Sequence, residues 1–422
     1  MNKPAVHVVG AGLAGLAAAV RLAGGPREIV LHEAARQAGG RCRSFYDPAL
    51  GLMIDNGNHL LLSGNHAARN YLAAIGSEDQ LAGPREAEFA FVDLVTKERW
   101  RLRPNAGALP WWIFAPLRRV PGTGPFDYLG LLWLLVPGKD APLDAVMRCD
   151  GLLYERLWRP FFLAALNTEP AEASSRLAAA VVLETLAKGG RACRPLVAAQ
   201  GLSAAFIEPA VDYLVQRGVT IRFDHRLRRI EFANGRAAAL DFSNDLVQLD
   251  GADKVVLAVP PSAAQGLVPD LRTPGACRAI VNAHFKIAPP ANCPAILGIV
   301  NGTIEWLFAF RDRLSVTISS ADRLLDIARE KLAETIWAEV AEATRIEKPL
   351  PPWQIIKEKR ATFAATVAEN AQRPGTGTAY ANLVLAGDWT ATGLPATIEG
   401  AIRSGHRAAG LIVASRLRQG AA

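Results

Sequence analysis

Residues 5–15 read Ala-Val-His-Val-Val-Gly-Ala-Gly-Leu-Ala-Gly, and this stretch decides the fold of the N-terminal part. Its first five residues, four of them apolar, predict a short buried strand. Gly10, Gly12 and Gly15 then form G-x-G-x-x-G, and an alanine-rich helix is expected over 16–23. Gly10 permits the tight turn, Gly12 lets a pyrophosphate approach the backbone, and Gly15 lets helix and strand pack closely. The helix N-terminus then faces the phosphates.

A second strand is expected over 29–31, and Glu33 stands just after it. In dinucleotide-binding folds an acid at about this distance beyond the glycines hydrogen-bonds the adenosine ribose. Strand, glycines, helix, strand and acid occur in the required order. We therefore predict an α/β protein with a Rossmann-type dinucleotide-binding domain.

The length and composition of the chain indicate a large globular protein. Its 422 residues favour two domains over one, and half of them are hydrophobic while 21% are charged. The formal net charge of +7 is spread along the chain without a basic run, so we expect no nucleic-acid partner. Five scattered cysteines without C-x-x-C or metal-ligand spacing indicate reduced thiols in a cytoplasmic protein.

Segments near both ends of the chain decide between nicotinamide and flavin. Residues 33–44 contain Gly39-Gly40-Arg41, and residues 383–389 read as a buried strand that ends in Gly387-Asp388. Residues 393–401 then open a helix. Together these segments resemble the amine oxidase and phytoene desaturase superfamily of flavoproteins, so the resemblance implies FAD as the cofactor.

The resemblance also implies where the FAD lies. Arg41 is expected near the phosphates, Asp388 at a ribityl hydroxyl, and the C-terminal helix with its N-terminus toward the flavin pyrimidine, where a helix dipole suits the anion of the reduced ring. Residues 218–230 resemble the superfamily's strand whose backbone, around Leu227, contacts the adenine. The expected cofactor-binding residues are Gly10, Gly12, Leu13, Ala14, Gly15, Glu33, Ala34, Gly39, Gly40, Arg41, Gly57, Asn58, His59, Leu227, Gly387, Asp388, Ala396, Thr397 and Ile398.

These placements predict two interlocked, discontinuous domains of amine oxidase-like type. The FAD-binding domain is expected over 1–105, 197–270 and 380–422. A mixed α+β substrate domain is expected over 106–196, a helical insertion, and 271–379, which reads as strands such as 279–285 followed by a helix over 321–343.

Two segments narrow the family. Residues 55–59, Asp-Asn-Gly-Asn-His, occupy the superfamily position beside the flavin ring, and residues 158–168, Trp-Arg-Pro-Phe-Phe-Leu-Ala-Ala-Leu-Asn-Thr, lie in the insertion. Together they resemble the hydroxysqualene dehydroxylases, also called squalene-associated FAD-dependent desaturases, of hopanoid biosynthesis. The resemblance implies that reduced FAD delivers hydride to hydroxysqualene, from which water leaves to give squalene.

That reaction needs a proton donor and a dry apolar site for a thirty-carbon chain. We expect His59 to be the donor, because imidazole titrates near neutrality, with Asn56 and Asn58 orienting it. A hydrogen-bonding role for His59 toward the flavin or the backbone is an equal alternative. No further histidine or carboxylate stands at ligand spacing, so we assign no metal.

Four other functions remain open at this level. A carotenoid-type polyisoprenoid desaturase would run hydride transfer in the opposite direction, and a nicotinamide dehydrogenase would use the first motif alone. An amine oxidase usually has an aromatic residue where this chain has Leu394. A flavin-binding scaffold without turnover is the last alternative. No second G-x-G-x-x-G occurs in mid-chain, so we expect the electrons to arrive from another protein or from free reduced cofactor, and the donor itself is unknown.

One stretch suggests contact with a membrane. Residues 109–136 contain Pro110-Trp-Trp-Ile-Phe and a run of apolar residues over 129–136, with Arg118 and Arg119 between them. Aromatic residues near arginines favour the lipid interface, although such residues also pack inside proteins. No stretch approaches the roughly 18 apolar residues of a spanning helix. We expect a cytoplasmic protein bound peripherally to the inner membrane.

Overall fold

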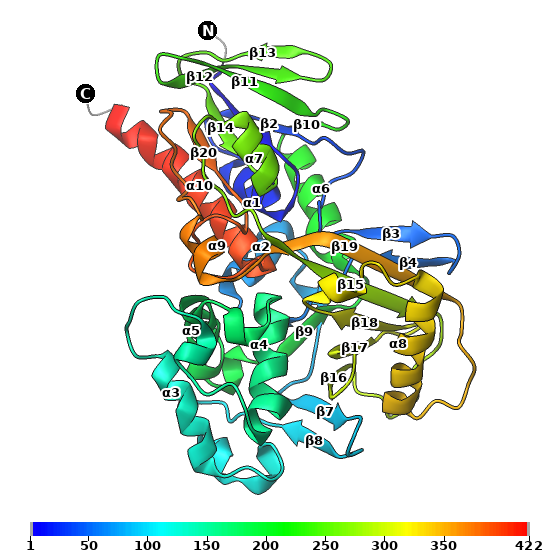
Figure 1. Cartoon of the computed structure of the whole chain (residues 1–422). Coiled ribbons are helices and arrows are strands. Elements are labelled where there is room, and N and C mark those ends of the chain that lie inside the picture. Colours follow the sequence, from blue (N-terminus) through cyan, green and yellow to red (C-terminus); the bar gives the residue numbers. More distant parts are fainter. Residues whose placement is uncertain (1–2, 420–422) are drawn as a thin grey trace.

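The computed structural model describes residues 3–419 and builds one sheet from strands far apart in the chain (Figure 1). Its order is β10-β2-β1-β14-β20, and every pairing in it is parallel. The strands are β1 (Ala5–Val9), β2 (Glu28–His32), β10 (Thr220–Arg222), β14 (Lys254–Leu257) and β20 (Leu383–Leu385). The N-terminal motif and the C-terminal strand therefore belong to the same layer, as the sequence predicts for a discontinuous Rossmann-type unit.

Helices from both ends of the chain pack beside this sheet. They include α1 (Leu13–Leu22), α2 (His66–Ile75), α6 (Glu208–Gln216), α7 (Pro261–Leu267) and α10 (Ile398–Gln419). Helix α10 lies close against α1 at Gly405, where an added Cβ would lie 2.2 Å from the carbonyl oxygen of Ala14. Val6 and Val8 of β1 share a buried cluster with Leu16 of α1. The absence of a side chain at Gly405 thus lets the last helix lie against the first.

A three-stranded antiparallel sheet lies at the end of the molecule near the N-terminus (Figure 1). It consists of β11 (Leu227–Ala233), β12 (Arg236–Phe242) and β13 (Leu246–Gln248). We expected one strand over 218–230, but the chain turns at Asp224, which has φ of +51°. Its backbone N–H donates to the carbonyl oxygen of Ala35 at 3.1 Å. Residues 220–222 therefore join the parallel sheet, and Leu227 begins a different sheet.

A seven-stranded sheet, ordered β19-β15-β18-β17-β16-β7-β8, forms the lower right of Figure 1. Its strands are β7 (Phe89–Asp93), β8 (Arg99–Leu102), β15 (Cys277–Phe285), β16 (Ile296–Val300), β17 (Trp306–Ala309), β18 (Leu314–Ile318) and β19 (Trp353–Phe363). Its apolar face, including Val281 and Val316, packs against Ile336 of α8 (Arg329–Thr344). The opposite face carries Asn282 and Thr317, which point toward the segment 55–59.

Strands β7 and β8 depart from the division that we expected. Residues 89–102 fall within the predicted FAD-binding range, yet β7 pairs in parallel with β16. The phenyl ring of Phe91 occupies the space over Gly298, where an added Cβ would lie 2.4 Å from the ring. The division into two domains stays a prediction, with this segment moved to the second sheet. The helix expected over 321–343 begins later, at Arg329, after a 3₁₀ turn at Ala321–Leu324.

The insertion is helical, as expected, but its helices are short. Most of its apolar side chains are shared with the sheets in one buried cluster. A π-helical turn at Tyr154–Trp158 leads into α4. Pro160 stands just after this turn and has no N–H to donate, which fits a break in the α-helical pattern. The remaining elements are α3 (Leu131–Leu134), α4 (Arg159–Leu166), α5 (Ser175–Glu184), α9 (Val367–Ala371), β3 (Ser44–Asp47), β4 (Leu52–Asp55), β5 (Leu61–Leu62), β6 (Leu81–Ala82) and β9 (Pro195–Ala198).

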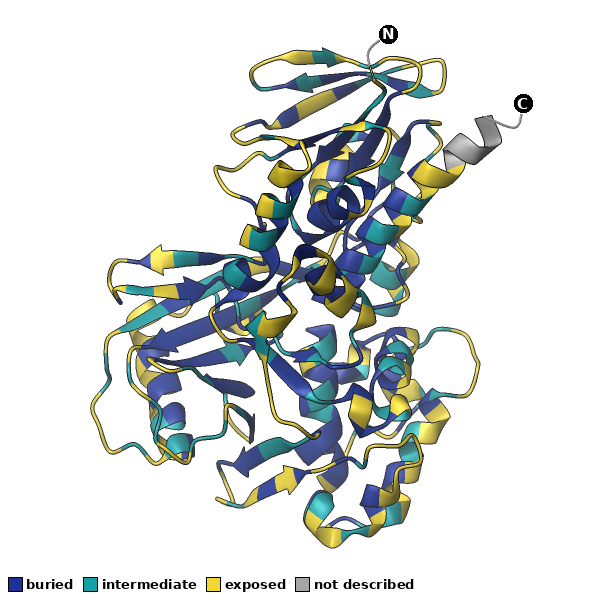
Figure 2. Ribbon diagram, turned by 180° about the vertical axis from the view of Figure 1, so that it is seen from behind, coloured by how far each residue is buried: buried dark blue, intermediate teal, exposed yellow. Residues whose placement is uncertain are grey.

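The apolar stretch 109–136 divides into buried and exposed side chains. Trp112, Ile113, Tyr128 and Leu134 are buried. Nine others are exposed, and these are Leu109, Trp111, Phe114, Leu117, Phe126, Leu129, Leu132, Trp133 and Val136. The segment lies at the end of the molecule opposite β11–β13, where yellow residues gather in Figure 2. Among the described residues, no helix is both long and apolar enough to cross a membrane.

Candidate flavin site and the residues beside it

The glycine turn after β1 leaves room for a ligand at one position only. A Cβ added to Gly10 would lie 2.5 Å from the carbonyl oxygen of Ala258. A Cβ added to Gly15 would lie 1.9 Å from the carbonyl oxygen of Gly10. At Gly12 it would meet nothing within 4 Å. Gly10 and Gly15 are therefore required by packing inside the protein, whereas Gly12 borders open space. This is the arrangement that a pyrophosphate at the N-terminus of α1 requires.

The Gly39-Gly40 segment lies directly against this turn. The Gly39 N–H donates to the carbonyl oxygen of Ala11 at 2.8 Å, and Gly39 pairs with Gly12 in an isolated bridge. Glu33 ties the turn to the second strand, because its carboxylate accepts the Ala11 N–H at 2.7 Å and the Ala35 N–H at 2.9 Å. The structure thus brings together the three N-terminal parts that the sequence predicted to share the cofactor.

A chain of hydrogen-bonded histidines supports the corner next to Glu33. His7 Nδ1 lies 3.1 Å from His32 Nε2, His32 Nδ1 lies 2.9 Å from His225 Nδ1, and His225 Nε2 lies 2.7 Å from the Asp245 carboxylate. The backbone N–H of His225 donates to the Glu33 carbonyl oxygen at 2.8 Å. Burial lowers the pKa of His32 to about 2, so this ring is neutral at pH 7. The sequence showed the three histidines but not that they meet.

Arg41 and Asp388 join the two ends of the chain. One guanidinium nitrogen of Arg41 lies 2.7 and 2.8 Å from the two Asp388 carboxylate oxygens. The Arg41 side chain is 45% exposed, whereas that of Asp388 is 9% exposed. The resemblance placed these residues at different parts of FAD. The structure shows them paired with each other, so their predicted contacts with FAD stay predictions.

Arg373 is a supporting residue that the sequence reasoning missed. Its buried guanidinium donates to the carbonyl oxygens of Asp388 at 3.1 Å and Trp389 at 3.4 Å, and to the Thr392 hydroxyl at 3.1 Å. It also lies over the ring of Phe363 at 4.7 Å. Burial lowers its pKa to about 10, which leaves it charged at pH 7. Arg373 holds the loop after β20 in shape, but it stands in no motif that would have revealed it.

The start of α10 follows the expected Gly387-Asp388 turn, with Ala396, Thr397 and Ile398 at its beginning. The Thr397 hydroxyl accepts the Gly400 N–H at 3.0 Å. The buried carboxylate of Glu399 accepts the backbone N–H groups of Ala67 and Ala68, at 3.0 and 2.8 Å. Glu399 therefore caps α2 from another helix and fixes how α10 meets the segment that follows His59.

The segment Asn56–His59 is held by the seven-stranded sheet. The Asn58 amide donates to Val316 O and to the Thr317 hydroxyl, both at 3.2 Å, and Asn282 bonds to the backbone of Asn56 and Asn58 at 3.4 Å. The Asn58 side-chain oxygen is buried without a partner among the described residues. It is an acceptor that a donor on a bound group can satisfy.

The environment of His59 differs from what we expected. Asn56 bonds to Glu358 at 3.2 Å and Asn58 to β18, so neither amide orients the imidazole, and they shape the backbone instead. The His59 ring makes no hydrogen bond with any described residue. Burial and then the nearby charge of Arg41 lower its pKa to about 4. His59 is therefore a neutral imidazole at pH 7 with free nitrogen atoms.

His284 supports the same segment from behind. Its Nδ1 lies 2.7 Å from the Ser315 hydroxyl and its Nε2 lies 3.1 Å from the Asp55 carbonyl oxygen. Burial lowers the pKa of His284 to about 3. A neutral ring that donates from Nε2 and accepts at Nδ1 satisfies both contacts. Neither His284 nor Asn282 could be tied to this segment from sequence, because both lie in β15, far along the chain from it.

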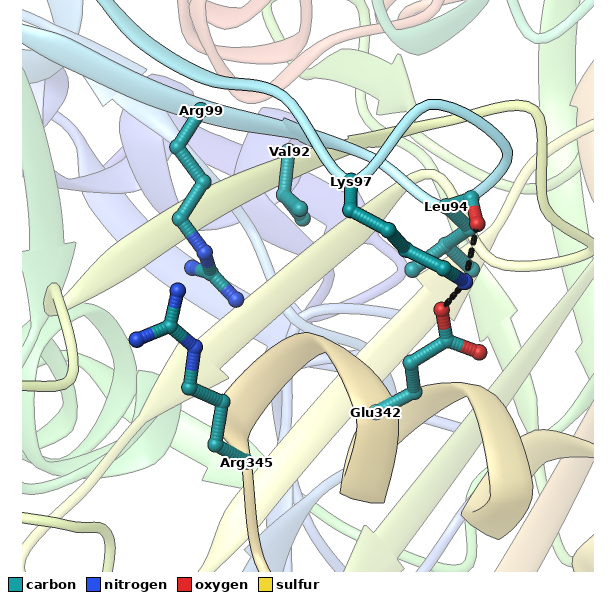
Figure 3. A pocket seen from close by; sticks show the side chains of 6 residues that line it. All are labelled: Val92, Leu94, Lys97, Arg99, Glu342 and Arg345. Carbon is teal, nitrogen blue, oxygen red and sulfur yellow. Dashed lines mark hydrogen bonds and ion pairs between the residues drawn. The ribbon is translucent and has the colours of Figure 1, made fainter.

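A surface pocket lies elsewhere, at the C-terminal end of α8 (Figure 3). Its volume is about 180 Å³, and Arg99 and Arg345 face each other in it beside a Lys97–Glu342 ion pair. Arg99 donates to the carbonyl oxygen of Ala343 and so caps α8. Small-molecule sites usually span about 300–1,000 Å³ and are mostly apolar. This charged pocket does not suit a thirty-carbon substrate. In the described part of the chain, no group of three or more potential metal ligands gathers.

Comparison with known proteins places this architecture in a family. Residues 13–413 match the family described as flavin containing amine oxidoreductase. The chain belongs to this family. As a flavin containing amine oxidoreductase, it is an FAD-dependent oxidoreductase, and the open glycine turn and the unpaired Asn58 oxygen fit a bound cofactor.

Curated relatives of this flavin containing amine oxidoreductase match almost the full length of the chain. A hydroxysqualene dehydroxylase from Rhodopseudomonas palustris is 56% identical over 97% of this chain and 98% of its own. One from Sinorhizobium fredii is 54% identical over 96% of this chain and 97% of its own. The crystal structure of a putative protoporphyrinogen oxidase from Exiguobacterium has a TM-score of 0.70 at 17% identity, covering 99% of this chain and 100% of its own, which shows the shared fold.

Proposed function

We propose that this protein removes the hydroxyl group of hydroxysqualene reductively and releases squalene, as a step in hopanoid biosynthesis. The observation that carries the proposal is the 54–56% identity, over almost the full length of both chains, to proteins named hydroxysqualene dehydroxylase. Reduced FAD supplies the hydride when it is bound. The carotenoid-type desaturase is the alternative, and it differs in the direction of hydride transfer.

We further propose which residues hold the cofactor. Gly10 to Gly15 and the Gly39-Gly40 segment border the diphosphate, Glu33 and the Leu227 backbone the adenosine, and Gly387 to Ile398 the flavin end. The open space at Gly12 supports the first assignment. For His59 the neutral, unpartnered imidazole supports the second of its two predicted roles, hydrogen bonding to the flavin.

The apolar interior between the insertion and the seven-stranded sheet supports a polyisoprenoid substrate. Trp158 and Phe162 of the insertion share one buried cluster with Trp306 and Phe308 of β17 and with Trp389, which follows Asp388. Apolar walls exclude water from a carbon centre that becomes cationic when its hydroxyl leaves. These apolar side chains bind the substrate chain and shield it from water, while the polar groups at the edge of the cluster hydrogen-bond to its hydroxyl oxygen.

The test is anaerobic incubation of the dithionite-reduced holoenzyme with hydroxysqualene, with flavin absorbance followed and the lipid extracted for mass analysis. Squalene formed together with oxidised flavin is the expected result. A flavin spectrum without lipid conversion would move the substrate assignment to the desaturase, which we would then assay in its oxidised form with squalene and with phytoene-like polyenes.

We also propose that the exposed part of residues 109–136 contacts the lipid surface. Leu117 is 91% exposed, Phe126 79% and Trp133 67%, and patches of this kind mark interaction sites. Arg118 and Arg119 lie between these residues, where they suit anionic headgroups. Flotation with vesicles of phosphatidylcholine and phosphatidylglycerol tests this. The variant L117S/F126S/W133S should stay unbound, and equal flotation of variant and parent would contradict the proposal.

A further inference from the structure

The reaction needs a group that is protonated at neutral pH near the substrate oxygen. An allylic hydroxyl leaves far more easily as water than as hydroxide, and a positioned acid supplies that proton. His59 is a weak candidate, because its lowered pKa of about 4 leaves it without an acidic proton at pH 7. Asn56 and Asn58 carry no acidic proton at all. The proton must therefore come from another side chain or from solvent.

Glu305, immediately before β17, has the properties of such a donor. Its side chain is 7% exposed, and one carboxyl oxygen accepts the Ser319 N–H at 2.6 Å. No cation in the described part of the chain lies within ion-pair distance of it, and its second oxygen makes no hydrogen bond there. Burial raises its pKa to about 8, although Ser319 N–H, Arg323 and Arg159 act in the opposite direction. Most Glu305 side chains are therefore protonated at pH 7.

The charged groups nearest to Glu305 are occupied with other partners. Arg159 of α4 lies 3.0 Å from the Glu169 carboxylate, and Arg323 donates to the Ser320 carbonyl oxygen at 3.0 Å. Glu169 itself raises the pKa of Glu305 slightly further. A buried carboxylic acid without its own cation is costly to ionise and keeps its proton, in the way that catalytic acids do in apolar sites.

The position of Glu305 connects the segment beside the flavin with the insertion. Asn58 bonds to Thr317, and Ser319, which binds Glu305, lies two residues further along the same chain, a rise of about 7 Å. Trp306 follows Glu305, pairs with Thr317 across the ladder, and belongs to the apolar cluster shared with the insertion. Glu305 thus lies at the polar edge of the apolar cluster, close to the segment that the resemblance placed beside the flavin.

The insertion closes onto the same edge. At the end of α4, the Asn167 side-chain oxygen accepts the Ser320 N–H at 2.7 Å, and its amide donates to the Thr362 hydroxyl at 2.9 Å. Residues 158–168, which carry the narrower resemblance, therefore dock next to Ser319 and Glu305. The indole N–H of Trp306 is buried without a partner among the described residues, so a hydrogen-bond donor also awaits an acceptor here.

We propose that Glu305 is the acid that protonates the departing hydroxyl of the substrate, a role that rests on the proposed function. The carbon–oxygen bond breaks, the oxygen takes the Glu305 proton and leaves as water, and the carbon gains the hydride that reduced FAD supplies. Glu305 is left as a carboxylate and regains its proton from solvent. The Ser319 N–H stabilises that carboxylate, and the apolar cluster keeps other water away from the carbon.

The variant Glu305→Gln tests the proposal, because glutamine keeps the shape and can accept the Ser319 N–H but has no acidic proton. We expect kcat to fall by about 100-fold or more with FAD content and KM within threefold of the parent. Glu305→Asp should retain an intermediate rate. The matched control is Glu155→Gln, an exposed carboxyl of the insertion that forms no ion pair in the described part of the chain, and it should keep most of the parent activity.

Two readouts separate an acid from a structural residue. The parent kcat should decline above pH 8, whereas that of Glu305→Gln should show no such decline. In an analogue with fluorine in place of the hydroxyl, fluoride leaves with less need of a proton donor than hydroxide does. This analogue should therefore restore most of the variant's rate. In infrared difference spectra of the holoenzyme, a carboxylic acid band that disappears near pH 8 should be present in the parent and absent from the variant.

The outcomes distinguish this proposal from the proposed function. If the parent forms no squalene, the proposed function fails, and with it the role of Glu305. If the parent forms squalene and Glu305→Gln does so within threefold of the same kcat, the acid assignment alone is overturned. A slow variant that the fluorinated analogue does not rescue, with no infrared band titrating near pH 8 in the parent, also overturns it.

Discussion

Acidification should loosen the support of the segment Asn56–His59, and the lowered pKa of His284 gives the size of this effect. The ring is fully buried and its pKa falls from the ordinary 6.5 to about 3. A pKa that is lower in the folded state means that the unfolded state binds more protons, so stability is present above pH 6.5 and is lost as the pH falls. At pH 5 protonation of this histidine in the unfolded state shifts the folding equilibrium toward unfolding by a factor of about 30, which lowers the free energy of unfolding by about 2 kcal/mol.

His32, with a pKa lowered to about 2, adds a cost of the same size at pH 5. Together the two rings contribute a loss of about 4 kcal/mol in the free energy of unfolding between pH 8 and pH 5, whereas Glu305, whose pKa is raised to about 8, binds its proton more tightly in the folded state and offsets about 3 kcal/mol of that loss. Urea unfolding of the holoenzyme at both pH values, with FAD in fixed excess, measures this difference. In His284→Gln the amide can still donate to Asp55 O and accept from Ser315, so between pH 8 and pH 5 the change in the free energy of unfolding should differ from that of the parent by about 2 kcal/mol, in favour of stability at pH 5.

The matched control is His66→Gln, the same substitution at an exposed histidine at the start of α2, measured at the same two pH values. The reasoning would be refuted by a His284→Gln protein whose unfolding free energy still changes as much between pH 8 and pH 5 as that of the parent. Such a result would mean that His284 is either protonated in the folded protein or not linked to unfolding in this pH range.

Three further changes test the parts that surround the cofactor. Gly12→Val should fold normally and lose at least tenfold in FAD affinity, measured by fluorescence titration, because a side chain there would enter only the space for the ligand. Gly15→Ala should fail to fold, as seen by circular dichroism, because its Cβ would lie 1.9 Å from a backbone oxygen. A Gly12→Val protein with parental FAD affinity would contradict the first prediction. Glu399→Ala should lower the free energy of unfolding by about 3 kcal/mol, because it removes the cap of α2 and leaves Arg403 without one of its two carboxylate partners. Thermal and urea unfolding measure this loss. An unchanged free energy of unfolding would show that the Glu399 contacts with α2 and Arg403 do not stabilise the fold. Arg373→Lys should weaken FAD binding about tenfold while the fold persists, because an ammonium group cannot bond to all the carbonyl groups that the guanidinium reaches. FAD dissociation on dilution measures this loss. Unchanged dissociation would show that the shape of the loop after β20 does not depend on Arg373.

Local sequence was sufficient to predict the turns and helices that we propose hold the cofactor. Gly15 is required by its contact with Gly10 inside one strand-turn-helix unit, and Gly10 has φ of +104° in the turn itself, so the spacing of the two predicted the turn, although Gly10 also packs against Ala258 from a distant part of the chain. The Gly387-Asp388 turn and the helix after it were predicted at the C-terminal end from the resemblance of this segment to the flavoprotein superfamily. Glu33 and Gly39 lie close in sequence to the glycine turn, and both bond to Ala11 as short connections allow.

Tertiary structure alone decided which side chains support these elements. Asn282, His284, Arg373 and Glu305 lie in sequence among ordinary strand and loop residues, and their importance arises from partners in other elements. Sheet pairing also placed β7 in the seven-stranded sheet beside β16, because the ring of Phe91 occupies the space over Gly298, in a strand far along the chain.

The protonation states of the buried side chains were likewise decided by the tertiary structure alone. The identity of His59 as a histidine suggested an acid, since the free side chain titrates near neutrality. Burial and the charge of Arg41 lower its pKa to about 4, and burial raises that of Glu305 to about 8. The sequence therefore determined the cofactor motifs and the family, which depend on backbone geometry over a few residues. Only the folded protein determined where protons reside, because that depends on how much water and which charges the whole chain leaves around each group.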